Sequence, residues 1–123
     1  MRVLLVDDET ELVSALAERL ALREIAAEWT ASGEEALSRV ARERFDLAVL
    51  DMKMPGLSGL ALKERLQGLD PRLKFIFMTG YGSEDVFEAI RRDHAGNVFL
   101  IKPVDIQELM AAMRAALGTD KEA

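Results

Sequence analysis

The stretch LAVLDMKMPGLSG, residues 47–59, combines a strand pattern, a candidate site residue and a helix start. Its first four residues are apolar and lead directly to Asp51, which is typical of a short buried strand that ends at a polar side chain. A proline, two glycines and a serine follow, and they indicate a turn-rich loop before the next helix. The stretch therefore predicts a strand–loop–helix unit with a carboxylate at the carboxyl end of the strand.

Three other apolar runs of the same length also lead to polar residues. VLLV precedes Asp7 and Asp8, FIFM precedes Thr79, and VFLI precedes Lys102. The carboxyl ends of parallel strands share one edge of an open α/β sheet, and ligands bind at that edge. If the four runs are parallel strands, one crevice collects five polar side chains: Asp7, Asp8, Asp51, Thr79 and Lys102.

Apolar runs alternate along the chain with stretches of helical periodicity, which predicts five βα units in one domain. The expected strands cover about 2–6, 25–30, 46–50, 73–78 and 97–101, the second of them at a sheet edge. The expected helices begin near Thr10, Ser32, Gly59, Ser83 and Asp105. Capping patterns support two of these starts, namely Ser32 with Glu35 and Asp105 with Glu108. Crossovers between parallel strands are right-handed, so helices should cover both faces and form a three-layer, doubly wound sandwich.

Composition narrows the class of protein. A chain of 123 residues suits one domain with its own core. It has no cysteine, which excludes disulfides and thiolate metal sites. The net charge of −6 argues against direct nucleic-acid binding. The apolar runs are too short to cross a membrane and the N-terminus does not resemble a signal peptide, so we expect a cytoplasmic protein.

The five polar side chains suggest phosphate and metal chemistry. Neighbouring carboxylates repel one another unless a cation neutralises them, and carboxylate oxygens suit Mg²⁺. Lys102 would add a positive charge, and Thr79 a hydroxyl that can donate to a phosphoryl oxygen. Each residue taken alone also has a structural interpretation: Asp7 or Asp8 as a helix cap, Thr79 as a loop residue and Lys102 as a peripheral ion pair. Their joint position at four strand ends favours a site.

At this point the sequence resembles the receiver domain of two-component response regulators over nearly its whole length. The matching pieces are LLVDDE, ASGEEAL, LAVLDMKMPGLSG, MTG and IKP, in this order. The resemblance implies a flavodoxin-like (βα)5 fold with a parallel sheet of order 2-1-3-4-5. It also implies that Asp51 accepts a phosphoryl group from the phosphohistidine of a histidine kinase or a histidine phosphotransfer protein. On this interpretation residues 1–118 form the receiver domain, and 119–123 are a polar tail or the start of a linker.

The resemblance further assigns roles to single residues. Asp8 and Asp51 would bind Mg²⁺ directly, the backbone carbonyl of Lys53 would be a further ligand, and Asp7 would act largely through water. Thr79 and Phe99 would be the switch residues that respond to phosphorylation. The peptide bond before Pro103 is expected to be cis, so that it directs the ammonium of Lys102.

Other positions are assigned to tuning or to the core. Lys53, Tyr81 and Gly80 match family positions near the phosphoryl pocket; we expect the first two to crowd the hydrolytic water and the glycine to allow close backbone approach. His94 is interpreted as a surface residue. The methionines are interpreted as core residues, namely Met78, Met110 and Met113.

Three other functions compete with the phospho-acceptor switch. A Mg²⁺-dependent phosphatase would need D-x-D after the first strand, where this chain has adjacent aspartates. A flavin module would need a phosphate-cradling loop there, and DDETE would repel a phosphate. A degenerate receiver would act by docking alone. The sequence leaves open the output, which includes a phosphorylation-dependent homodimer through the fourth helix, fifth strand and fifth helix, or attachment as the N-terminal part of a transcriptional regulator.

Overall fold

The computed structural model describes residues 1–80 and 97–118, and these contain one five-stranded parallel sheet. Its order, β2-β1-β3-β4-β5, is the predicted one. The strands lie within one residue of their expected bounds, namely β1 Arg2–Val6, β2 Ala26–Thr30, β3 Leu47–Asp51, β4 Lys74–Thr79 and β5 Val98–Ile101. The flavodoxin-like architecture is therefore confirmed.

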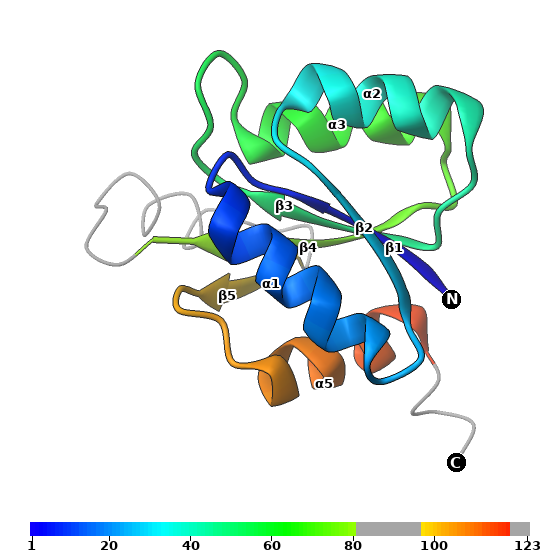
Figure 1. Cartoon of the computed structure of the whole chain (residues 1–123). Coiled ribbons are helices and arrows are strands. Elements are labelled where there is room, and N and C mark those ends of the chain that lie inside the picture. Colours follow the sequence, from blue (N-terminus) through cyan, green and yellow to red (C-terminus); the bar gives the residue numbers. More distant parts are fainter. Residues whose placement is uncertain (81–96, 119–123) are drawn as a thin grey trace.

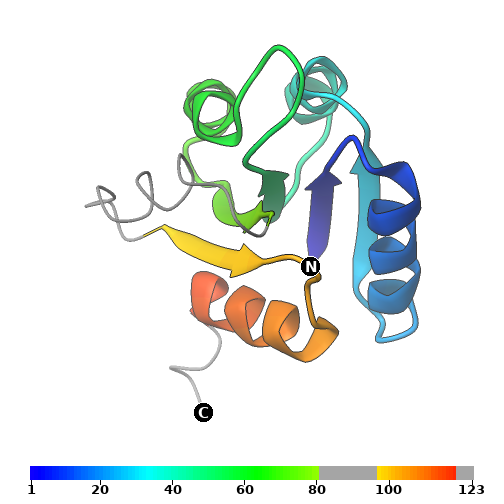
Figure 2. The same cartoon turned by 90° about the vertical axis from the view of Figure 1, so that its left-hand side faces the viewer.

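Helices cover both faces of the sheet (Figure 1), as right-handed crossovers require. On one face lie α1 Thr10–Ala21 and α5 Ile106–Leu117, and on the other lie α2 Gly33–Arg42 and α3 Gly59–Leu69. Figure 2 shows the pair of α2 and α3 end-on above the strands. The helix expected from Ser83 and the tail 119–123 lie outside the described residues, so the domain boundary at 118 stays a prediction.

Alternation along the strands divides the core into two clusters, one on each face. On β1, Val3 and Leu5 pack with residues of α1 and α5, whereas Leu4 and Val6 pack with residues of α2 and α3. The methionines that we assigned to the core lie there: Met78 and Met113 are buried, and Met110 packs against the same cluster as they do. The two clusters hold β1 and β3 at the centre of the sheet and so fix the positions of the carboxylates that follow them.

Helix capping follows the sequence at α2 but not at α5. The hydroxyl of Ser32 accepts a hydrogen bond from the backbone N–H of Glu35, which is one half of the predicted capping box. Ser58 caps α3 in the same way through the N–H of Ala61. Asp105 occupies the N-cap position of α5, but its side chain accepts no capping hydrogen bond, so the predicted cap was wrong. The carboxylate of Asp105 is exposed and water can satisfy it.

At the amino end of β1, an ion network joins β1, β2 and α2. We call Arg2, Glu28, Arg39 and Glu43 the Arg2 network. Each guanidinium pairs with both glutamates, with 2.8 Å between Arg2 and Glu43. Both guanidinium groups also lie over the ring of Phe45, at 4.5 and 5.7 Å. Two positive and two negative charges therefore balance at this end of the sheet.

The helices of the described part of the chain were also compared with what a bilayer requires. Within residues 1–80 and 97–118, none is both long and apolar enough to span a membrane.

Candidate functional site

Three carboxylates meet at the carboxyl edge of the sheet, as the sequence predicts. One oxygen each from Asp7, Asp8 and Asp51 lies within 4.8 Å of the other two. Asp51 is the last residue of β3, and Asp7 follows β1, where its backbone N–H still donates to Thr30 of β2. Asp7 and Asp51 are buried, whereas Asp8 is exposed. The buried pair is fixed by the strands, and Asp8 closes the cluster from the loop.

Lys102 follows β5 and brings an ammonium into this cluster. Its Nζ lies 2.8 Å from Asp7 Oδ2, 2.8 Å from Glu9 Oε1 and 3.4 Å from Asp51 Oδ1. Its backbone N–H donates to the carbonyl oxygen of Thr79, which ties the ends of β4 and β5 together. The peptide bond between Lys102 and Pro103 is cis. The ammonium is thus surrounded by three carboxylates.

Charge is unbalanced at this edge, and the pKa values reflect it. Burial raises the pKa of Asp51 to about 6, and repulsion from Asp7 adds to the rise, while Lys102 and the N–H of Lys53 oppose it. For Lys102, burial lowers the pKa, but its contacts with Asp7 and Glu9 and the charge of Asp51 outweigh burial and raise it. The lysine is therefore permanently charged, and any further cation that approaches would favour the ionised form of Asp51.

The residues present fit a hard divalent cation. Octahedral Mg²⁺ places its ligand oxygens roughly 3–4 Å apart, so a carboxylate group with the observed spread needs little contraction to bind it. In addition, Asp7 Oδ2 is buried and, among the described residues, accepts no hydrogen bond of good geometry, although the charge of Lys102 lies beside it. A buried carboxylate oxygen without a directed donor has unused capacity for a cation or its water. Asp7, Asp8 and Asp51 are the side chains that could hold the metal.

Thr79 and Phe99 lie near the site without touching the carboxylates in any contact that the structure records. Thr79 is buried at the end of β4, and its hydroxyl makes only a long hydrogen bond, 3.4 Å, to the carbonyl of Gly80. Phe99 lies opposite Phe77 in the β4–β5 pairing, is half-buried, and stacks on that ring with 5.3 Å between centroids. A weakly held hydroxyl and a half-buried ring are both able to rearrange.

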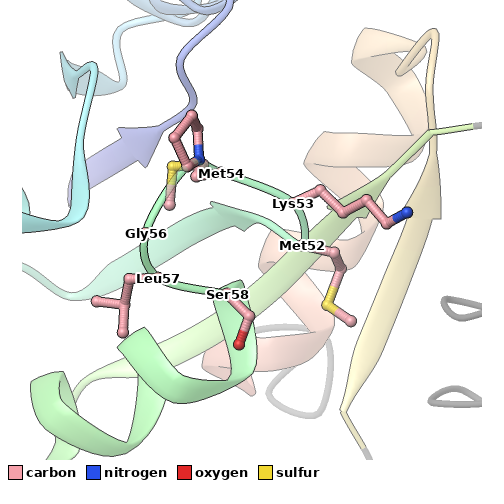
Figure 3. Close-up of a pocket in the computed structure, with 7 residues that line it drawn as sticks. Met52, Lys53, Met54, Gly56, Leu57 and Ser58 are labelled. Atoms are coloured by element: carbon pink, nitrogen blue, oxygen red, sulfur yellow. The ribbon is translucent and has the colours of Figure 1, made fainter.

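The loop from β3 to α3 borders the site and encloses a hollow lined by residues 52–58. Figure 3 shows that Lys53 and Leu57 leave this loop on opposite sides. The side chain of Lys53 is exposed, while its backbone N–H donates to Asp51 Oδ1 over 3.4 Å. At the end of the loop, a Cβ on Gly59 would lie 2.6 Å from the carbonyl oxygen of Asp51. Only a glycine lets α3 begin this close to the acceptor residue.

Sequence reasoning missed two features, the contact of Glu9 with Lys102 and the close approach at Gly59. Glu9 pairs with Lys102 across 93 positions of sequence, and only its place directly after the two aspartates hinted at the contact. Close backbone approach at Gly80 stays a prediction: among the described residues nothing lies within 4 Å of a Cβ there, but residues 81–96, which follow it directly, lie outside them. At Gly59, by contrast, the start of α3 abuts β3. Tyr81 and His94 lie outside the described residues.

Comparison with known proteins agrees with this geometry. The family model for the response regulator receiver domain matches residues 3–114. The chain is 34% identical to sporulation initiation phosphotransferase F of Bacillus subtilis, covering 94% of this chain and 93% of that protein. It is 35% identical to the response regulator MprA of Mycobacterium tuberculosis, but spans only 52% of that protein.

Solved structures give the same result. A response regulator receiver domain protein from Clostridium thermocellum superposes with a TM-score of 0.84 at 28% identity, covering 98% of this chain and 96% of the other. A CheY-like receiver domain protein from Methanospirillum hungatei gives 0.80 at 30% identity, covering 99% and 98%. With the sheet order, the carboxylate cluster and the lysine already in place, these matches show that the chain belongs to the receiver domain family of two-component response regulators.

Proposed function

We propose that this domain is a phospho-acceptor switch in which Asp51 takes a phosphoryl group from a phosphohistidine. The observation that carries the proposal is the placement of Asp51 at the end of a buried strand, 3.4 Å from the ammonium of Lys102 and within the cluster that it forms with Asp7 and Asp8. A carboxylate alone is a poor nucleophile toward a phosphoryl group with negative oxygens, because like charges repel. The charged residues around Asp51 reduce this repulsion.

The chain positions the acceptor and neutralises charge. A carboxylate oxygen of Asp51 forms a bond to phosphorus as the bond from phosphorus to the histidine nitrogen breaks, and the imidazole leaves with the bonding electrons. Lys102 offers its charge to the phosphoryl oxygens. Bound through Asp8, Asp51 and the backbone carbonyl of Lys53, with Asp7 acting through water, Mg²⁺ would supply further charge neutralisation and alignment. At pH 7 most Asp51 is ionised, since its pKa of about 6 lies below that pH.

Phosphorylation is proposed to move Thr79 and Phe99. The hydroxyl of Thr79 exchanges its long hydrogen bond to Gly80 for a shorter one to a phosphoryl oxygen. The vacated space lets the ring of Phe99 turn inward from its half-buried position. Equal exposure of this ring in structures with and without a bound beryllofluoride would contradict the movement.

We propose that phosphorylation changes the binding of partners to the face formed by the fourth helix, β5 and α5. Of these three elements, the structure describes β5 and α5. The donor would be a histidine kinase or histidine phosphotransfer protein, and the recipient a second copy of the domain or an attached output domain of a transcriptional regulator. We also propose that the protein is cytoplasmic, that this domain does not bind nucleic acid directly, and that Lys53 and Tyr81 slow hydrolysis of the phosphorylated state. Gly80 is proposed to lie beside the phosphoryl pocket and to allow close backbone approach there.

Phosphoramidate tests the proposal, because its phosphorus–nitrogen bond resembles that of phosphohistidine. With Mg²⁺, we expect a phosphoprotein that hydroxylamine cleaves, as an acyl phosphate requires, and that is absent from Asp51→Asn. Asp46→Asn is the matched control, since that exposed aspartate lies just before the same strand, at its other end. Labelling that survives Asp51→Asn would place the acceptor elsewhere and contradict the proposal.

A further inference from the structure

The ammonium of Lys102 directs its one well-formed hydrogen bond to Glu9, among the described side chains that surround it. Nζ donates to Glu9 Oε1 over 2.8 Å. Asp7 Oδ2 is equally close, but it lies outside hydrogen-bond geometry, and Asp51 is farther away at 3.4 Å. In this state of the protein, therefore, Glu9 as well as Asp7 engages the group that the proposed function needs on the phosphoryl oxygens.

Glu9 is also the partner that can leave. Its side chain is 61% exposed, whereas that of Asp7 is fully buried. Asp7 is anchored as well, because its Oδ1 accepts the backbone N–H of Glu9 over 2.9 Å. A released Glu9 carboxylate returns to water at little cost, while a released Asp7 would remain as an unpaired buried charge. When a phosphoryl group arrives, the contact to Glu9 is the one that exchanges.

On this basis, which rests on the proposed function, we propose that Glu9 is a positioning residue that competes with the phosphoryl group for Lys102. It holds the ammonium in the unphosphorylated domain and is displaced when Asp51 is modified. The backbone N–H of Glu9 is held by Asp7, so rotation of the exposed Glu9 side chain can displace the carboxylate while this hydrogen bond stays in place.

Competition in the unphosphorylated state should change the rate of phosphorylation but not the rate of dephosphorylation. Loss of Glu9 removes an interaction that exists before phosphorylation and not after it. Phosphorylation should therefore accelerate, and affinity for beryllofluoride should rise, while the dephosphorylation rate stays unchanged. A change that only disturbed the fold of the site would slow phosphorylation instead.

Three variants test the proposal with acetyl phosphate, Mg²⁺ and intact-mass time courses. Glu9→Gln removes the charge, and Glu9→Asp keeps the charge but draws the carboxylate back from Lys102 by one methylene. Glu11→Gln is the control, because this exposed residue in the first turn of α1 makes the same change in net charge away from the lysine. We expect phosphorylation to accelerate about two- to fivefold in both Glu9 variants, the range to which exposed ion-pair energies convert, and to be unchanged in Glu11→Gln.

Several results would overturn the proposal. Acceleration in Glu9→Gln but not in Glu9→Asp, or an equal acceleration in Glu11→Gln, would show that charge alone acts. Equal changes in the phosphorylation and dephosphorylation rates would place the effect in their shared transition state. Unchanged rates in both Glu9 variants, with wild type still modified at Asp51, would reject Glu9 and leave the phospho-acceptor function intact. Wild-type protein without any Asp51 adduct would instead reject the function and this inference together.

Discussion

The two ends of β1 differ in their charge balance. At its amino end, Arg2 belongs to a network in which two guanidinium groups meet two carboxylates. Beyond its carboxyl end, the ammonium of Lys102 contacts three carboxylates, those of Asp7, Glu9 and Asp51, and Asp8 adds a fourth carboxylate beside two of them. The first arrangement satisfies its own charges. The second leaves negative charge uncompensated among the described residues, which makes it suited to bind a cation.

The pKa values express the same contrast. Hydrogen bonds from Arg39, and then from Arg2, hold the pKa of Glu43 down at about 2. Arg2 and Arg39 likewise lower the pKa of Glu28. Burial and the charge of Asp7 raise the pKa of Asp51 to about 6. Ionisation is therefore favoured by folding at one end of the strand and opposed by it at the other, which gives predictions of opposite sign.

The largest effect is expected at the ammonium. Lys102→Met should slow phosphorylation of Asp51 by acetyl phosphate by about 100-fold, the scale on which removal of one charge-stabilising donor acts. Lys74→Met, at the exposed start of β4, should leave the rate unchanged. Intact-mass time courses measure both. A Lys102→Met rate within threefold of wild type would remove the lysine from the mechanism and weaken the contrast between the two ends.

The same chemical change should have opposite effects on stability at the two ends. Without metal at pH 7, Asp51→Asn should raise the free energy of unfolding by about 1–3 kcal/mol, because it removes a buried charge whose pKa folding raises. Glu28→Gln should lower it by about 0.5–1 kcal/mol, since that partly exposed carboxylate pairs with two guanidinium groups. Urea denaturation gives both values. Destabilisation by both variants would show that the carboxyl edge is as satisfied as the Arg2 network.

A divalent cation should stabilise the fold by binding beyond the carboxyl end of β1, and not at the Arg2 network. At ten times its Kd, Mg²⁺ should raise the free energy of unfolding of wild type by about 1.4 kcal/mol, through preferential binding to the folded state. Asp8→Asn should lose most of this stabilisation, because Asp8 contributes an oxygen to the cluster. Glu28→Gln should keep all of it. Thermal melts over a Mg²⁺ titration test this, and an Asp8→Asn response equal to that of wild type would exclude that residue as a ligand.

The smallest effect is a pH dependence with two limbs in metal-free protein. The raised pKa of Asp51 contributes stability that is present below its unfolded pKa near 3.8 and is lost as pH rises through about 6. The lowered pKa of Glu43 contributes stability that is present above 4.5 and is lost as pH falls toward 2. Stability should therefore be highest near pH 4, where the gain on the Glu43 limb and the loss on the Asp51 limb cancel, with about 1 kcal/mol lost from pH 5 to 7.5 on the Asp51 limb.

Variants separate the two limbs. Asp51→Asn should flatten the decline above the maximum and leave the acid limb in place. Glu43→Gln should weaken only the acid limb. Free energies of unfolding measured from pH 3 to 8 in the presence of a chelator provide the curves. A decline above pH 6 that persists in Asp51→Asn would assign it to another group.

The sequence predicted most of the carboxyl edge and little of the Arg2 network. Apolar runs that end in Asp7, Asp51, Thr79 and Lys102 locate the site, because parallel strands align their carboxyl ends. The Arg2 network joins residues from three separate elements, and no local pattern connects Arg2 to Glu43. Such contacts depend on side-chain directions that exist only after the sheet has formed.

The errors share this origin. The pairing of Glu9 with Lys102 depends on how an exposed side chain lies across the crevice. The close approach at Gly59 depends on how closely α3 abuts β3. Asp105 has the right position and residue type for a cap, yet its side chain does not make the bond. Periodicity and motif spacing specify the backbone framework, whereas close contacts require the packed structure.

The central claim is that Asp51, at the carboxyl edge of the sheet where negative charge is in excess, accepts a phosphoryl group. The most direct test is the intact mass of the protein after incubation with acetyl phosphate, with and without Mg²⁺, in wild type and Asp51→Asn. We predict an added mass of about 80 Da, the signature of one phosphoryl group, that requires both Asp51 and the metal. No added mass in wild type with Mg²⁺, together with no perturbation by beryllofluoride, would leave a receiver-shaped docking module and contradict this account.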